Sequence, residues 1–139
     1  IIGLAKACEM FNPEEAARIR AVRDHFEKRV LAEIPYTNVN GNISARVCPT
    51  RNITFKYIDA EAVIGYVPEV CCSLGSACTA GEDAASHVLM AMRLDPVDIR
   101  GTIRFSFGRY NTIDEADRAV ELLKIGIEKL RMMSPLYNR

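Results

Sequence analysis

Apolar residues recur at helical spacing in two long segments, one toward each end of the chain. The first segment begins at the capping pair Asn12-Pro13 and runs to about residue 33. Its apolar face consists of Ile19, Val22, Phe26 and Val30. The second segment opens at a capping box formed by Thr112 and Glu115. Its apolar stripe consists of Ala116, Val120, Leu123, Ile127 and Leu130. Both patterns predict amphipathic helices with one buried face.

Between these two helices, short apolar runs alternate with turn residues. Strands are expected at 37–39, 43–47, 52–57, 69–73 and 102–107. Shorter helices are expected at 1–10, 60–67 and 86–92, and Asp95-Pro96 is expected to break the chain. Helices combined with several short strands predict the α+β class.

Composition indicates one globular domain with a core of its own. The 139 residues are 49% hydrophobic and 26% charged, and the chain is near the modal domain size. Its 18 basic and 18 acidic side chains cancel, so nothing in the charge favours nucleic acid or an anionic membrane as a partner. No apolar run approaches the ~20 residues that span a bilayer.

The five cysteines do not suggest a disulfide framework. Their number is odd, and Cys71 and Cys72 are adjacent on an expected strand, where their side chains would point to opposite faces. We therefore expect a reducing, cytoplasmic setting. The cysteines also lack the paired spacings of zinc and iron–sulfur motifs, so no metal ligands are predicted. Cys8 and Cys48 are expected to be small core residues.

One cysteine lies in a different setting. Cys78 belongs to the segment 73–81, which is built from Ser, Gly, Ala and Thr and cannot itself form a core. Glycines near both ends allow tight turns and movement. Such a thiol is either an ordinary loop cysteine or a nucleophile, and no general base is evident nearby in the sequence.

Arg104 is the second candidate functional residue. The alternation along 102–107 places its side chain on the face opposite three apolar groups. It therefore faces either solvent or a cleft. A guanidinium held on a strand is suited to binding a carboxylate, because its planar fork donates two parallel hydrogen bonds.

Several motifs together resemble the C-terminal small domain of class I cysteine desulfurases, which are pyridoxal-phosphate enzymes of fold type I. They are Cys72-Ser73-Leu74-Gly75-Ser76-Ala77-Cys78-Thr79, Ser86-His87-Val88-Leu89, Ile103-Arg104-Phe105-Ser106-Phe107-Gly108-Arg109-Tyr110 and Ser134-Pro135-Leu136-Tyr137. The order matches along essentially the whole chain. Leu74 and Ala80 stand where the family usually has serine.

The resemblance implies a set of roles. The parent enzyme would convert L-cysteine to L-alanine and leave a persulfide on Cys78. Arg104 would bind the substrate carboxylate. The sulfur would pass to an iron–sulfur scaffold protein, and the full-length enzyme would be a homodimer.

The resemblance also implies that residues 1–139 are only part of an enzyme. The chain opens inside an expected helix without an initiator Met, and its five lysines lack the preceding His found before the family's cofactor lysine. We therefore expect pyridoxal phosphate to be held by a large domain outside this chain, and the chain alone to be inactive. Two alternatives remain: a stand-alone persulfide carrier or docking module, and a redox or metal sensor that uses Cys71, Cys72 and Cys78.

Overall fold

A computed structural model describes residues 1–74, 86–135 and 137 of the chain. Within these ranges the chain forms six helices and three strands. In chain order they are α1 (Ile2–Glu9), α2 (Pro13–Glu33), β1 (Thr37–Val39), β2 (Thr50–Phe55), α3 (Ala60–Tyr66), α4 (His87–Ala91), α5 (Pro96–Arg100), β3 (Thr102–Ser106) and α6 (Ile113–Met133). The α+β class predicted from the sequence is confirmed.

The two long helices begin where their capping residues predict. The Asn12 side chain accepts a hydrogen bond from the Glu14 amide, and Pro13 occupies the first helical position of α2. At α6, the Thr112 hydroxyl accepts from the Glu115 amide, while the Glu115 carboxylate accepts from the Thr112 amide. These bonds satisfy amide groups that have no partner within the first helical turn.

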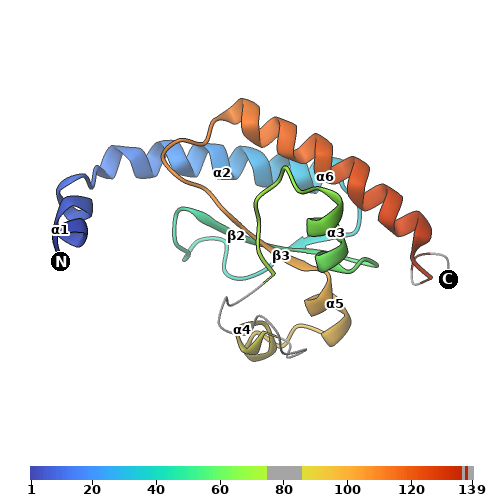
Figure 1. Cartoon of the computed structure of the whole chain (residues 1–139). Coiled ribbons are helices and arrows are strands. Elements are labelled where there is room, and N and C mark those ends of the chain that lie inside the picture. The colour runs from blue at the N-terminus through green and yellow to red at the C-terminus, as the bar shows by residue number, and fades with distance from the viewer. Residues whose placement is uncertain (75–85, 136, 138–139) are drawn as a thin grey trace.

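The three strands form an antiparallel sheet in the order β1-β2-β3. The helices α2 and α6 lie along one face of this sheet, and the short helices α4 and α5 lie on its other side (Figure 1). This arrangement divides the sheet into an apolar face beneath the long helices and a polar face turned toward α4 and α5.

The core lies between the sheet and the two long helices. Its fully buried large side chains include Phe26, Val30, Ile53, Phe55, Ile103, Leu123 and Ile127. The rings of Phe26 in α2 and Phe105 in β3 are 4.9 Å apart between centroids. The apolar stripes predicted for both long helices are confirmed as buried, except that Ile19 and Leu130 are half-buried at the margins.

A buried arginine also links α2 to the sheet. Arg51 lies on the core-facing side of β2, is 2% exposed, and pairs with two carboxylates of α2. Its Nη2 is 2.7 Å from an Asp24 oxygen, and its Nε contacts Glu27. The two carboxylates offset the cost of burying this charge.

Two predicted strands are wrong. Residues 43–47 form bends, because the Asn42 side chain accepts hydrogen bonds from the Ser44 and Ala45 amides and closes a local turn. Residues 69–72 are also not a strand. The turn that follows α3 continues to Val70, and the segment meets β3 only at Ser73.

Other expectations are wrong in detail. Asp95-Pro96 starts helix α5, because the Asp95 side chain caps the Val97 amide and proline fits the first helical position. Cys8 is exposed, whereas Cys48 is half-buried. At the end of α6, Arg131 takes the buried position and Met132 and Met133 are exposed.

The boundaries of the remaining elements agree with the prediction to within a few residues. The Asp59 side chain caps α3 by accepting a hydrogen bond from the Glu61 amide. No helix among the described residues combines the length and apolar character needed to cross a membrane.

Candidate functional site

The register of β2 and β3 determines which side chains share the polar face of the sheet. Asn52 is paired with Arg104, and Thr54 is paired with Thr102. Directly paired residues of an antiparallel ladder project to the same side. The predicted placement of Arg104 opposite the apolar side chains of β3 is therefore confirmed, and Arg104 is exposed.

Arg104 is held by Ser73, which lies shortly before residues 75–85 in the sequence. Its amide donates to the Ser73 carbonyl at 2.7 Å, and its carbonyl accepts from the Ser73 amide at 3.0 Å. Its Nη2 also donates to the Ser73 hydroxyl at 3.0 Å. No ion pair among the described residues involves Arg104. Among the described residues, Ser73 is the one hydrogen-bond partner of the Arg104 side chain.

A network of amides and hydroxyls surrounds this position. The Asn40 Nδ2 donates to the Asn52 oxygen at 2.7 Å and to the Thr54 hydroxyl at 2.8 Å. The Thr54 and Thr102 hydroxyls are 2.7 Å apart, and Thr102 in turn donates to the Asp98 carbonyl. The network fixes β1, β2, β3 and α5 relative to one another. Sequence reasoning missed it because it depends on register rather than on any local motif.

Cys78 lies outside the described residues, as do Ala80 and the rest of 75–85. The described chain before this segment ends at the exposed Leu74. The catalytic role of Cys78 therefore stays a prediction.

The described thiols are in contrasting surroundings. Cys71 is exposed, whereas Cys72 is half-buried and packs against the core. Burial, and secondarily the neighbouring Cys71, raise the pKa of the Cys72 thiol to about 11. Cys72 is therefore protonated at neutral pH and is a poor nucleophile. The Cys48 thiol donates to the Ala16 carbonyl at 2.9 Å.

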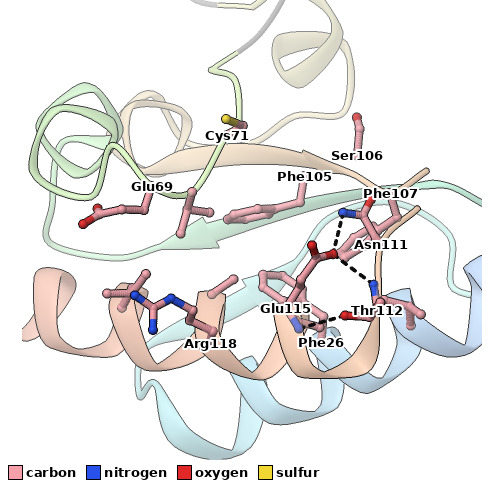
Figure 2. A pocket seen from close by; sticks show the side chains of 15 residues that line it. Phe26, Glu69, Cys71, Phe105, Ser106, Phe107, Asn111, Thr112, Glu115 and Arg118 are labelled. Atoms are coloured by element: carbon pink, nitrogen blue, oxygen red, sulfur yellow. Dashed lines mark hydrogen bonds between the residues drawn. The ribbon is translucent and has the colours of Figure 1, made fainter. Parts of the chain in front are cut away.

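A cavity of about 320 Å³ opens on the helix side of β3. It is lined by the segment 69–71, by the end of β3 with Phe107, and by the first turns of α6 (Figure 2). Most of its lining is apolar, and Arg104 is not part of it. The Glu115 carboxylate that faces this region accepts hydrogen bonds from the Thr112 amide and from Asn111 (Figure 2).

The two histidines lie on other elements than Arg104. His25 is half-exposed on α2, and its Nε2 is 2.5 Å from a carboxylate oxygen of Asp117 on α6. His87 is the exposed first residue of α4. Arg109 forms an ion pair with Glu15 at 3.2 Å.

The described residues do not form a site for pyridoxal phosphate. All five lysines are described, and four of them have partners elsewhere: Lys6 pairs with Glu9, Lys56 with Asp98, Lys124 with Glu33, and Lys129 lies over Tyr66. The fifth, Lys28, is exposed on α2. None of the five lines the cavity. Among the described residues, no group of three or more His, Cys, Asp or Glu side chains could hold a metal ion.

Comparison with known proteins gives a consistent family. Residues 1–119 match the aminotransferase class-V family. The chain is 42% identical over 142 residues to "Cysteine desulfurase 2" of Trichormus variabilis. This alignment covers 99% of this chain and 36% of that protein. It is 39% identical over 141 residues to "Cysteine desulfurase IscS" of Anaeromyxobacter sp. (strain K), covering 99% of this chain and 35% of that protein.

The solved structures agree in fold. A NifS-like protein from Rickettsia africae superposes with a TM-score of 0.70 at 24% identity, over 84% of this chain and 30% of that one. At 24% identity, this similarity shows a shared fold and nothing about function. The chain thus spans about a third of the length of these relatives.

Proposed function

Because the chain belongs to the aminotransferase class-V family, we propose that residues 1–139 are the small domain of a cysteine desulfurase. The resemblance to class I cysteine desulfurases that the motifs predicted is confirmed by relatives of that name along 99% of the chain. The observation that carries the function is Arg104, an exposed guanidinium fixed to Ser73 and free of any described carboxylate.

Arg104 would bind the α-carboxylate of L-cysteine. A guanidinium has five N–H donors, and one of them is used by Ser73. The others can form the paired hydrogen bonds that fit a carboxylate. An arginine is suited to this task because it keeps its charge at every physiological pH.

Cys78 would receive the sulfur. Its thiolate attacks the sulfur of the bound substrate, so that an S–S bond forms and the C–S bond of the substrate breaks. The substrate carbon keeps the electron pair of that bond and takes up a proton. The products are L-alanine and a Cys78 persulfide, which balances L-cysteine plus a protein thiol.

Pyridoxal phosphate, which supplies the electron sink for such reactions, would be held outside the described residues. In the parent enzyme this chain contributes the carboxylate clamp and the sulfur acceptor. We further expect a homodimer in the cytoplasm and transfer of the sulfur to an iron–sulfur scaffold protein.

The test is alanine formation from L-cysteine by the full-length parent, by its Cys78→Ala variant, and by residues 1–139 alone. We expect activity in the parent, loss in the variant, and none in the chain alone. Cys71→Ala is the matched control, because it removes an exposed thiol just before the segment 73–81 and should retain activity. Unchanged activity in Cys78→Ala would refute the assignment of the nucleophile.

A stand-alone persulfide carrier is the alternative that the same test addresses. In that case Cys78 would accept a persulfide from another protein, without any alanine formation. An upstream reading frame with a cofactor lysine would exclude this candidate. Uptake of labelled sulfur from a donor protein by a parent that forms no alanine would favour it.

A further inference from the structure

Ser73 and Arg104 are joined by three hydrogen bonds, two between their backbones and one between their side chains. We propose that Ser73 is a positioning residue for substrate binding, whose hydroxyl orients the Arg104 guanidinium toward the carboxylate of the substrate. This inference rests on the proposed function, because it takes Arg104 as the group that binds the carboxylate.

The need for such a residue follows from the exposure of Arg104. A free arginine side chain populates many rotamers, and fixing it upon binding costs conformational entropy. The bond from Nη2 to the Ser73 hydroxyl fixes the guanidinium before a ligand arrives. Part of the ordering cost is therefore met in the free protein, and the ligand binds more tightly.

Ser73 is itself held firmly enough to do this. Its amide and carbonyl both bond to the backbone of Arg104, which is paired on its other side with Asn52. The preceding residue, Cys72, packs against the core. The hydroxyl is therefore fixed relative to the strand that carries the guanidinium.

The chemistry of the partner matters as well. A hydroxyl accepts the hydrogen bond without neutralising the guanidinium, so the full positive charge remains for the substrate. A carboxylate at position 73 would orient Arg104 equally well, but it would compete with the substrate carboxylate for the same donors. Ser73→Asp should therefore weaken binding more than Ser73→Ala does.

The experiment measures the dissociation constants of L-alanine and of ethylamine for the full-length holoenzyme by calorimetry. These two ligands differ only in the carboxylate. In Ser73→Ala we expect L-alanine to bind about fivefold more weakly, with ethylamine unchanged. Ser73→Thr, which keeps the hydroxyl, should restore the binding of L-alanine. Ser106→Ala is the control, because Ser106 is an exposed serine two residues from Arg104 along β3, whereas Ser73 is half-buried.

In steady-state kinetics, Ser73→Ala should raise KM for L-cysteine and leave kcat nearly unchanged.

Three results would overturn the inference. Equal weakening of both ligands in Ser73→Ala would indicate a merely structural role. Unchanged L-alanine binding in Ser73→Ala, with weakened binding in Arg104→Ala, would refute the positioning role alone. Unchanged binding in Arg104→Ala would refute the proposed carboxylate clamp and the inference with it.

Discussion

The backbone of Gly101 lies directly against the backbone of Phe55. The Phe55 amide donates to the Gly101 carbonyl at 2.8 Å, and a Cβ on Gly101 would come well under 3.0 Å from the Phe55 carbonyl oxygen. This contact joins the end of α5 to β2 at the point where β3 begins. It therefore helps to fix the register that places Arg104 opposite Asn52.

Gly101→Ala is expected to destabilise the fold by about 2–3 kcal/mol, because the atoms that the new methyl group meets are backbone and cannot rotate away. Urea unfolding of the chain measures this. The control is Gly65→Ala in α3, where nothing lies within 4 Å of the added Cβ. That variant should be slightly more stable, by up to ~1 kcal/mol, since alanine favours helix. Equal stability of the two variants would contradict the close contact.

Arg131 packs the last turn of α6 against two tyrosines. It is 3% exposed, its Nε donates to the Lys56 carbonyl at 3.0 Å, and its guanidinium lies over the rings of Tyr36 and Tyr137. It forms no ion pair with a described carboxylate, and burial lowers its pKa. The backbone carbonyls and ring faces therefore replace the hydration of this cation.

We predict that Arg131→Ala destabilises the chain by about 3 kcal/mol, because it removes buried packing and hydrogen bonds together. The neighbouring Met132→Ala is the control, since Met132 is 64% exposed and should change stability little. Thermal unfolding compares the two. A small effect of Arg131→Ala would mean that the tyrosine rings pack equally well without the cation.

The hydroxyl of Thr54 links three elements on the polar face of the sheet. It accepts from Asn40 and lies 2.7 Å from the Thr102 hydroxyl. Thr54→Val keeps the shape but leaves both partners without their bond, so we expect a loss of about 1–2 kcal/mol. Thr54→Ser keeps the hydroxyl and should recover part of that loss. Urea unfolding of both variants distinguishes the hydrogen bond from packing.

An ion-pair cluster between α2 and α6 predicts an acid-dependent loss of stability. Hydrogen bonds from His25 and then Arg29 lower the pKa of the Asp117 carboxyl. A group whose pKa is lowered in the folded state stabilises the fold above its ordinary pKa, and this contribution is lost as the pH falls through the lowered value. The loss should therefore occur below about pH 4, where unperturbed aspartates also titrate.

Asp117→Asn should flatten the fall in unfolding free energy between about pH 4 and pH 2. The control is Glu121→Gln, which changes an exposed carboxylate of the same helix. Unfolding by urea at several pH values provides the measurement. An acid limb that is unchanged in Asp117→Asn would show that other carboxylates cause it.

Local patterns were sufficient to predict the long helices, because their caps and apolar stripes are properties of a few neighbouring residues. The same holds for β3, whose alternation correctly placed Arg104 on the polar face. The segments that failed are those whose conformation depends on one side chain. Asn42 turns a strand-like sequence into a bend, and Asp95 turns an expected break into a helix start.

Only those site residues could be predicted from the sequence whose side-chain type itself suggests a chemical role. Cys78 and Arg104 were identified from the motif and from alternation, and the role of each stays a prediction. Ser73 was not identified, because its importance depends on a backbone bridge to a residue 31 positions away. Pairing over that distance leaves no periodic signal in the sequence. The missed network of Asn40, Asn52 and Thr54 depends on strand register in the same way.

The adjacent thiols Cys71 and Cys72 should react at very different rates. Cys71 is exposed, whereas burial raises the pKa of Cys72 to about 11. The thiolate is the reactive form, so Cys72 should be alkylated slowly at pH 8 and faster as the pH rises toward 11. The rates are read by mass spectrometry of the parent protein in Cys71→Ser and Cys72→Ser backgrounds, in which the peptide carries one thiol of the pair at a time. Equal alkylation of the two thiols at pH 8 would show that the segment 69–73 opens from the core faster than the reagent reacts, and would contradict the packing of Cys72 described above.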